Sequence, residues 1–383
     1  MRILLLNWRD KTDRSYGGAE EFVDRLALEL SKNCEVTLFT SRGRGRARER
    51  RGKLEIIRRG SINTVYFRAA AYLSRNRSKY DAVIESVSSV PFFSPLVFDR
   101  RKVFVVIHHL MGSEVFRTAN PPKALAAYLA EKAIPSLYSG ARFLVLSDFV
   151  KRQLVEAGIK PDSIYKVGGY SPSRRRLREA KSVNPTIVSV GRLVRYKRND
   201  MLIRMFAELR KTVHDAELVI IGDGPERGRL EFLRNSLGLE SCVRFTGFLE
   251  ESRKDAQVSK SWVFATASRI EGLGFSVLRA EEMGLPVVAF GNGGLVEAVR
   301  NGYSGFVVRE GDKEAFINAL YRLVGSGRGK LLKRMSANAK KYAASFKEKD
   351  VHDVLDIVMS SLSASPQRRG KPRKAEREPR AAT

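Results

Sequence analysis

One glycine-rich stretch, residues 269–297, carries the residue types that could hold a sugar attached to a phosphate. Glu271 lies in a predicted loop, and Gly272 and Gly274 follow it at the start of a predicted helix, Phe275–Met283. Glycines at a helix start let backbone N–H groups approach a phosphate closely, and the helix dipole favours an anion there. A carboxylate beside that anion can accept hydrogen bonds from sugar hydroxyls. The stretch therefore favours a sugar-phosphate site, although similar glycine-rich joints also serve as plain turns.

The elements around this stretch follow a repeated strand–loop–helix order. Arg2–Asn7 predicts a first strand, and Ala19–Ser31 predicts an amphipathic helix because its apolar residues recur four apart. A second run of the same kind starts at Thr186–Val190. Strands that alternate with helices favour parallel sheets, so the expected fold class is α/β with two tandem doubly wound, Rossmann-like domains. Two such domains commonly face each other across a cleft at the carboxyl ends of their strands.

Composition and pattern set the expected domain boundaries. Residues 1–172 are expected to form the first domain and residues 183–335 the second, with a basic, polar segment between them. A C-terminal helical segment, 336–362, follows and could pack back on the first domain. Residues 363–383 are rich in proline and charge and have little to bury, which predicts a disordered basic tail.

The charge balance demands an anionic partner. The 383 residues carry a formal net charge of +28, which suits nucleic acid, acidic lipid or a phosphorylated substrate. The only two cysteines, Cys34 and Cys242, lie far apart, which argues against a disulfide framework and fits a reducing compartment. No apolar run approaches the roughly 18–20 residues of a membrane span. A cytoplasmic protein is expected, or one bound peripherally to the cytoplasmic face of a membrane.

The excess charge is concentrated away from the glycine-rich stretch. Residues 42–59 hold nine basic residues and two glutamates, and their lack of periodicity predicts a mobile cationic loop. Such a loop could meet anionic lipid or substrate, and a merely solvated loop is the alternative. Single-strand nucleic-acid binders interleave aromatic residues with basic ones, and neither 42–59 nor 368–380 contains an aromatic residue. Nucleic acid is therefore the least favoured partner.

Eight segments match the motifs of one known family in order and spacing. They are Gly17–Glu20, His108–His109, Ser147–Ile159, Gly191–Lys197, Val219–Glu226, Phe245–Phe248, Glu271–Gly274 and Gly293–Glu297. The chain resembles the retaining glycosyltransferases of GT-B fold, family 4 (glycosyl transferases group 1), over about residues 1–360. The resemblance implies that the second domain binds a nucleotide-sugar donor and that the first domain holds most of the acceptor.

The resemblance also implies roles for four residues, which we treat as the candidate catalytic set. Arg192 and Lys197 resemble the basic pair that holds the donor diphosphate, and fixed cations there would stabilise the charge that grows on the leaving group. Glu271 resembles the first glutamate of a Glu-x7-Glu pattern, which holds the donor sugar. His108 resembles a histidine that reaches the donor from the first domain, with a structural histidine at a strand end as the alternative.

The resemblance further implies a set of donor-binding residues. They are Gly17, Gly18, Gly191, Gly222, Gly247, Gly272, Leu273, Gly274 and Arg279. Arg279 departs from the family pattern, because it stands where the second glutamate, the usual ribose ligand, is expected. Gly284 and Pro286 stay in register, so no gap explains the change. We expect Arg279 to change donor preference.

No metal and no cofactor are expected. The chain has no Asp-x-Asp triplet and no His/Cys cluster with metal spacing, so Arg192, Lys197 and the helix N-terminus would neutralise the diphosphate. The expected function is metal-independent, retaining transfer of a sugar from a nucleotide-sugar to a hydroxyl of a glycan or lipid-linked acceptor, such as a cell-envelope glycan. The alternatives are a non-catalytic binding protein on the same fold and, less favoured, a nucleic-acid-binding protein.

Overall fold

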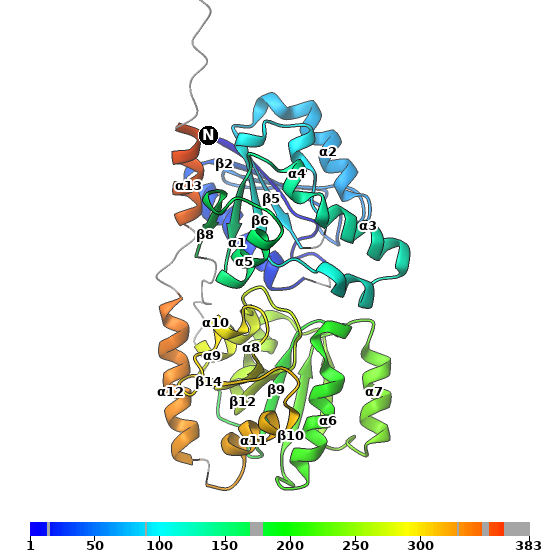
Figure 1. Ribbon diagram of the computed structural model, residues 1–383, viewed down its shortest axis with the longest axis vertical. Coiled ribbons are helices and arrows are strands. Elements are labelled where there is room, and N and C mark those ends of the chain that lie inside the picture. The colour runs from blue at the N-terminus through cyan, green and yellow to red at the C-terminus, as the bar shows by residue number, and fades with distance from the viewer. Residues whose placement is uncertain (14–15, 89, 169–178, 328, 347–351, 364–383) are drawn as a thin grey trace, which may run out of the picture.

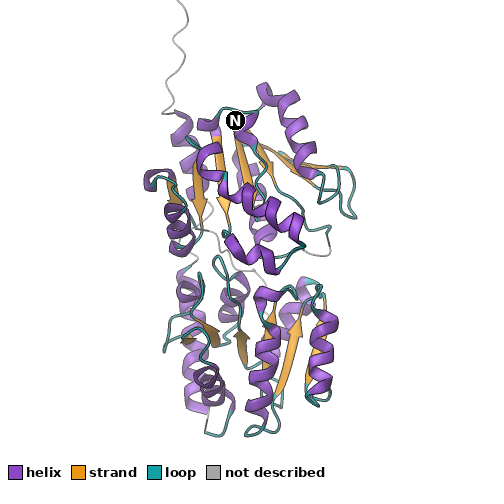
Figure 2. Cartoon of the chain, turned by 45° about the vertical axis from the view of Figure 1, so that its right-hand side comes forward, coloured by secondary structure: helices purple, strands orange, loops and turns teal. Residues whose placement is uncertain are grey.

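The chain is built as two α/β domains that lie one above the other along the long axis (Figure 1). The computed structural model describes residues 1–13, 16–88, 90–168, 179–327, 329–346 and 352–363. Residues 174–178 of the basic linker and the tail from 364 onward lie outside the described residues. In each domain helices cover both faces of a central sheet (Figure 2). The two tandem Rossmann-like α/β domains predicted from the sequence are confirmed.

The first domain has an eight-stranded sheet in the order β3-β4-β2-β1-β5-β6-β7-β8. All neighbouring strands in it are parallel except the antiparallel edge pair β3–β4. The central strands β5 and β6 are buried along their whole length, as parallel strands covered on both faces must be. The strands are β1 (Arg2–Leu6), β2 (Glu35–Thr40), β3 (Arg48–Arg51), β4 (Leu54–Arg58), β5 (Ala82–Val87), β6 (Val103–Ile107), β7 (Arg142–Val145) and β8 (Ile164–Lys166). The helices are α1 (Gly18–Asn33), α2 (Val65–Asn76), α3 (Pro121–Lys132), α4 (Ile134–Leu137) and α5 (Asp148–Glu156).

The second domain has a six-stranded, wholly parallel sheet in the order β11-β10-β9-β12-β13-β14. The strands are β9 (Thr186–Val190), β10 (Glu217–Ile221), β11 (Val243–Gly247), β12 (Val263–Thr266), β13 (Val287–Phe290) and β14 (Gly305–Val308). The helices are α6 (Asn199–Arg210), α7 (Arg227–Ser236), α8 (Glu251–Lys260), α9 (Phe275–Glu282), α10 (Leu295–Ala298) and α11 (Lys313–Val324). Because the strands are parallel, the loops after β9, β10, β12 and β13 all lie at one end of the sheet. The strand order reverses between β9 and β12, which is where α/β sheets commonly bind ligands.

The sequence predicted a loop over the whole arginine-rich segment 42–59, and this prediction is wrong for most of it. Residues 48–58 form the antiparallel pair β3–β4. Leu54, Ile56 and Ile57 are buried against the sheet, and that burial stabilises β4. Strand β3 is exposed, and two of its arginines, Arg48 and Arg51, contact glutamates of the same hairpin. Only residues 42–47 keep the loop that the sequence predicted.

Two C-terminal helices stand where the sequence predicted one segment. Helix α12 (Gly329–Ser345) packs on α9 and α11, so the predicted boundary at 335 falls inside a helix of the second domain. Helix α13 (His352–Ser363) lies beside the first domain (Figure 1), where Val354 and Val358 are buried in the same core as Ile3 and Leu5 of β1. The chain thus returns from the second domain to the first. Within the described residues, no helix has both the length and the apolar character needed to span a membrane.

Candidate functional site

The start of helix α9 is open and faces the first domain. Gly274 is its N-cap residue and adopts a left-handed conformation with φ of +83°, which favours glycine. No side chain caps this helix end. The positive end of the helix dipole and the backbone N–H groups at this helix end therefore suit an anion.

Lys197 and Glu271 meet beside this helix end. The Lys197 ammonium forms an ion pair with the Glu271 carboxylate, and the two side chains are only 17% and 15% exposed. Burial disfavours the charged ammonium, but Glu271 outweighs that effect, and the pKa of Lys197 is raised. Arg192 is exposed and lies near enough to act on Lys197 electrostatically. The structure therefore brings together three of the four predicted catalytic residues.

Several predicted glycines are explained by close contact between backbones. A side chain at Gly272 would place its Cβ 1.9 Å from the carbonyl oxygen of His108, in the first domain. A side chain at Gly222 would meet the carbonyl oxygen of Gly191 at 2.0 Å. Gly222 N also donates to Gly247 O at 3.0 Å, which ties the loops after β9, β10 and β11 together. These glycines allow the loops to pack tightly, and Leu273 is buried beside them.

The loop that ends at Gly17 and Gly18 lies against the start of α9. A Cβ at Gly18 would be 3.0 Å from the Phe275 side chain, so the two domains touch here. Glu20 fixes the loop, because its carboxylate accepts from Gly17 N at 2.9 Å and from Trp8 Nε1 at 2.8 Å. Together with Gly17, Glu20 forms a capping box at the start of α1. Gly17 and Gly18 are thus held opposite the donor loop.

The two histidines at the end of β6 have different surroundings. His108 is buried, its Nε2 lies 3.1 Å from Ser86 Oγ, and its ring packs edge-on against Phe22. Burial lowers the pKa of His108 to about 3. Burial also lowers the pKa of His109 to about 4, with Glu271 opposing that shift and Lys197 adding to it. His109 therefore lies within electrostatic reach of the Lys197–Glu271 pair, and a role for His108 toward the donor stays a prediction.

The sequence alone does not show which of the adjacent residues His108 and His109 faces the donor side of the second domain. Neighbouring residues at a strand end point in different directions, and the sequence does not show which one faces the second domain. What the sequence does show is a pair of adjacent histidines directly after an apolar strand, and this pair indicates the position.

Arg279 is held inside the second domain. Its Nε donates to Asp255 Oδ1 of α8 at 3.2 Å, and its Nη1 donates to Glu282 Oε2 at 2.8 Å. The Nη2 atom contacts the other oxygen of Asp255, so that pair is bidentate. Asp255 is 2% exposed. The guanidinium is therefore neutralised by two carboxylates, and any effect on the nucleotide must work against these contacts.

A second carboxylate, Glu297, joins the domains. Its oxygens accept from the backbone N–H groups of Asp148 and Phe149 at 3.0 and 2.9 Å, at the N-terminus of α5. Lys166 Nζ adds an ion pair at 3.0 Å. Nearby, Ser147 Oγ donates to Gly272 O at 2.6 Å. These contacts fix the donor loop against the first domain.

Among the described residues, no group of three or more His, Cys, Asp or Glu side chains is arranged to hold a metal ion. The thiols of Cys34 and Cys242 are free and buried in separate domains.

Two family matches cover most of the chain. Residues 173–342 match the family Glycosyl transferases group 1, and residues 16–169 match Glycosyltransferase Family 4. A GDP-mannose-dependent alpha-(1-6)-phosphatidylinositol monomannoside mannosyltransferase of Mycolicibacterium smegmatis is 36% identical over 165 residues, 41% of this chain and 43% of the relative. Alpha-D-kanosaminyltransferase of Streptomyces kanamyceticus is 32% identical over 168 residues, 43% of each chain. The matched stretch thus spans less than half the length of these relatives.

Solved structures share the fold over nearly the whole chain. HepE of Anabaena, solved with UDP and glucose, has a TM-score of 0.71 at 19% identity, covering 95% of this chain and 99% of its own. Sucrose-phosphate synthase of Thermosynechococcus elongatus has a TM-score of 0.76 at 18% identity, covering 95% and 100%. At this identity the likeness shows the fold.

Proposed function

The chain belongs to family 4 of the GT-B glycosyltransferases, and from this premise we propose that it transfers a sugar from a nucleotide-sugar donor to an acceptor hydroxyl. One observation carries the proposal. Lys197, Glu271 and Arg192 converge at the uncapped start of α9, where the second domain meets the first. Cations, a helix N-terminus and a carboxylate in one place suit a diphosphate attached to a sugar.

In the proposed reaction the donor diphosphate lies at the start of α9 with Lys197 and Arg192 beside it. The bond between the anomeric carbon and the diphosphate oxygen breaks, and the acceptor oxygen bonds to that carbon from the same face. The acceptor proton passes to the departing phosphate, so no protein nucleophile is required and the configuration is retained. Lys197 and Arg192 stabilise the leaving charge, and Glu271 accepts hydrogen bonds from sugar hydroxyls. We propose that His109, which lies within electrostatic reach of Lys197 and Glu271, forms a hydrogen bond with the donor.

We propose that the reaction needs no divalent ion. The cations that would bridge the diphosphate are side chains of the second domain. Turnover should therefore persist with excess EDTA, measured with the donor identified below. Complete loss that Mn²⁺ or Mg²⁺ restores would contradict this proposal.

The experiment that tests the donor site is thermal stabilisation by a panel of nucleotide sugars. A donor that binds the folded state raises the melting temperature by mass action. Lys197→Gln should reduce that stabilisation, because it removes a cation from the diphosphate. Arg195→Gln is the matched control, since Arg195 is an exposed cation of the same short segment that faces Glu226. Equal stabilisation of both variants would place the diphosphate elsewhere.

The same panel separates transfer from mere binding. If one nucleotide sugar stabilises the protein but is neither hydrolysed nor transferred with any acceptor tested, the chain is a binding protein on this fold. In a separate comparison, thermal stabilisation by each nucleotide sugar of the panel is measured for Arg279→Met and for the unchanged protein. We propose that Arg279 shifts donor preference, and equal changes for every donor would contradict that.

We propose a glycan or lipid-linked acceptor, presented at an anionic membrane surface. The relative from Mycolicibacterium smegmatis acts, by its name, on a phosphatidylinositol monomannoside. In loop 42–47, Arg44 and Arg46 are exposed and their side chains contact no carboxylate among the described residues. A cation near an anionic surface contributes about 1 kcal/mol, screened by salt. Arg44→Gln with Arg46→Gln should weaken binding to anionic vesicles, and equal binding to neutral and anionic vesicles would favour a soluble acceptor.

A further inference from the structure

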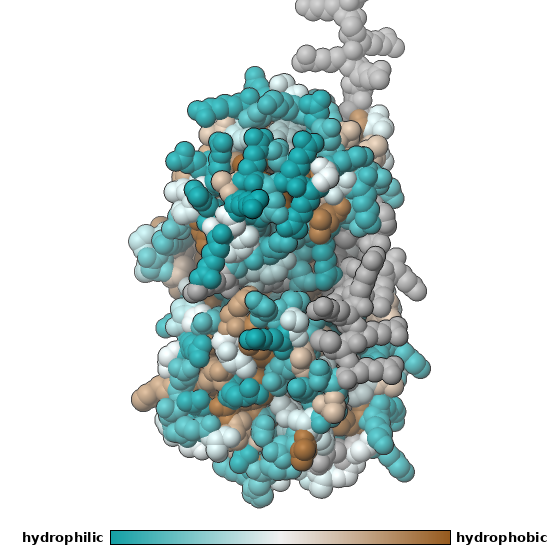
Figure 3. All heavy atoms as spheres, turned by 180° about the vertical axis from the view of Figure 1, so that it is seen from behind, coloured by the Kyte–Doolittle hydropathy of each residue, from teal (hydrophilic) through white to brown (hydrophobic). Residues whose placement is uncertain are grey.

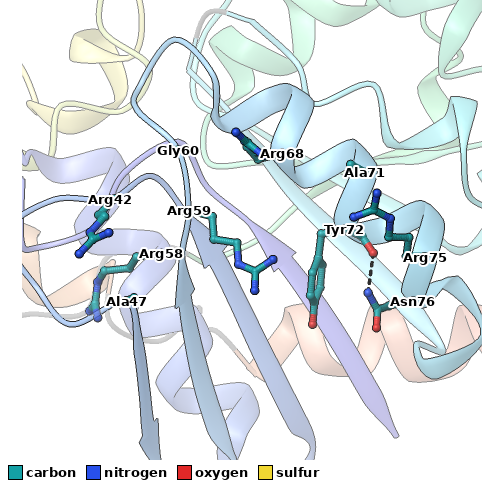
Figure 4. A pocket seen from close by; sticks show the side chains of 10 residues that line it. All are labelled: Arg42, Ala47, Arg58, Arg59, Gly60, Arg68, Ala71, Tyr72, Arg75 and Asn76. Atoms are coloured by element: carbon teal, nitrogen blue, oxygen red, sulfur yellow. Dashed lines mark hydrogen bonds between the residues drawn. The ribbon is translucent and has the colours of Figure 1, made fainter.

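A cavity in the first domain, away from the donor loop, is lined mainly by arginines. Its volume is about 640 Å³, and it lies between the ends of β2 and β4 on one side and α2 on the other. Figure 4 shows Arg59 pointing toward Tyr72 of α2, with Arg42 and Arg58 on the opposite side of Arg59. The lining residues, which we call the arginine pocket, are Arg42, Ala47, Arg58, Arg59, Gly60, Arg68, Ala71, Tyr72, Arg75 and Asn76.

The five arginines of the pocket fall into two classes. Arg58 is buried and neutralised, because its Nε donates to Asp10 Oδ2 at 2.7 Å and its Nη2 donates to Glu49 Oε2 at 3.1 Å. The other four are exposed and form no ion pair with a carboxylate among the described residues: Arg42, Arg59, Arg68 and Arg75. Four like charges around one cavity repel one another unless an anion lies between them.

Some arginines next to the pocket are paired with carboxylates. On the adjoining hairpin, Arg48 contacts Glu55 and Arg51 contacts Glu49. Those arginines satisfy their charge within the fold, and so does Arg58. Arg44, Arg46 and Arg50 are also exposed without a carboxylate contact among the described residues. What distinguishes the pocket is that four such arginines line one cavity, within a first domain whose side chains are hydrophilic over much of its surface (Figure 3).

The pocket is connected to the site at the domain interface. Asp10, which holds Arg58, also accepts from Thr12 Oγ1 at 2.6 Å. Both belong to the β1–α1 connection, which ends at Gly17 and Gly18 against Phe275. The pocket thus lies at the carboxyl ends of β2 and β4, the same edge of the sheet that faces the donor loop.

We propose that the arginine pocket binds a phosphate or diphosphate group of the acceptor. Guanidinium groups match phosphate oxygens with two parallel hydrogen bonds, which makes arginine the preferred cation for phosphate recognition. Four guanidinium groups carry more positive charge than a ligand with one carboxylate would neutralise, which favours a phosphate or diphosphate. The donor diphosphate has its own cations, Arg192 and Lys197, in the second domain. The word acceptor rests on the proposed function, whereas phosphate binding rests on the pocket alone.

The test is binding of inorganic pyrophosphate to the full chain, measured by calorimetry. Arg68→Gln with Arg75→Gln removes two exposed cations of the pocket without opening the core. Because hydrogen bonds to charged groups are strong, the variant should raise the Kd at this site by about tenfold to a hundredfold. The matched control is Arg77→Gln with Lys79→Gln, which removes the same charge just beyond α2 and outside the pocket. The control should change the Kd by less than about twofold, as expected for a field effect screened by salt.

Four outcomes decide the proposal. Loss of pyrophosphate binding in the pocket variant, with unchanged stabilisation by nucleotide sugars, supports it. Equal pyrophosphate binding in the pocket and control variants overturns it, as does binding that only Lys197→Gln removes, because the probe then occupies the donor site. A pocket variant that binds single-stranded RNA less tightly but pyrophosphate equally well also overturns it.

A second arm identifies the source of the phosphate. Vesicles of phosphatidylcholine with phosphatidic acid should bind the unchanged protein, and pyrophosphate should compete, if the phosphate belongs to a lipid headgroup. Pyrophosphate binding without vesicle binding assigns the pocket to a water-soluble phosphorylated acceptor. Vesicle binding that pyrophosphate does not reduce overturns the pocket assignment. If no nucleotide sugar binds or turns over, the proposed function fails while the pyrophosphate result stands as an anion site.

Discussion

The donor side of the second domain and the arginine pocket of the first domain handle positive charge in opposite ways. Around α9, Lys197 contacts Glu271 and Arg279 contacts Asp255 and Glu282. In the pocket, the four exposed arginines, unlike buried Arg58, contact no carboxylate among the described residues. Paired charges hold a site in shape before a ligand arrives, at the cost that the ligand must displace or join the pair. Unpaired charges leave the whole attraction for the ligand, at the cost of mutual repulsion in its absence.

The difference also shows which mutations should damage the fold. A charge that is buried with a partner is expensive to leave alone, whereas an exposed unpaired charge is cheap to remove. The following predictions test this contrast through stability, and the first concerns the pair of Arg279 with buried Asp255.

Arg279→Glu should destabilise the protein by about 3–5 kcal/mol, because buried Asp255 would lose its partner and meet a second carboxylate. Chemical denaturation of the variant and the unchanged protein measures the difference. Arg253→Glu is the control, since Arg253 is exposed on α8, the helix that carries Asp255, and the charge change is identical. Equal losses in the two variants would show that total charge matters more than the pair.

Glu281 of α9 is a fully buried carboxyl group. It is 0% exposed, and neither carboxylate oxygen has a hydrogen-bond partner among the described residues. Burial raises the pKa of Glu281 to about 9, and the Ser304 hydroxyl opposes that rise only in part. The folded state therefore keeps a proton that the unfolded state releases above about pH 4.5. Its contribution to stability is full below that pH and is lost as the pH rises toward 9.

Glu281→Gln removes this titration. The stability of the variant relative to the unchanged protein should increase by about 1.4 kcal/mol per pH unit, or about 3 kcal/mol between pH 5 and pH 7. Denaturant unfolding at both pH values measures it. A constant difference would mean that Glu281 is ionised or solvated in the folded protein.

The smallest effect is expected in the arginine pocket. Arg68→Gln with Arg75→Gln should leave the free energy of unfolding within about 0.5 kcal/mol, with any change toward stabilisation, because two repelling charges are removed. Raising the salt concentration should shrink the gain. A loss of more than 1–2 kcal/mol, roughly the cost of a broken buried contact, would show that these arginines have partners in solution.

Much of the second domain could be predicted from its sequence, for a physical reason. The strand at Thr186–Val190 has the bounds that its apolar run predicted, and the predicted helix Phe275–Met283 corresponds to α9, Phe275–Glu282. Parallel strands buried on both faces are apolar throughout, and glycines mark where their loops touch. Glu271, Lys197 and Arg192 were singled out by the resemblance to the family, and in the structure Lys197 contacts Glu271 with Arg192 nearby.

The parts that the sequence did not predict depend on contacts between distant segments. Strand β3 is an exposed edge strand of arginines and a glutamate, so it has no apolar period, and only pairing with β4 makes it a strand. Asp255, the partner of Arg279, lies 24 residues away on a polar helix. The arginine pocket joins loop 42–47, the end of β4 and one side of α2, and no local pattern brings these together.

The measurement that tests the central claim most directly is turnover of a nucleotide sugar by the unchanged protein and by Glu271→Ala. The assay follows release of the nucleoside diphosphate, with the donor that stabilises the protein most. Glu314→Ala, an exposed carboxylate on α11, is the control, and melting curves show that each variant is folded. Because Glu271 would accept hydrogen bonds from the sugar and hold Lys197, its removal should lower the rate by about tenfold to a hundredfold. A folded Glu271→Ala variant that turns the donor over at the unchanged rate would contradict the assignment of the site.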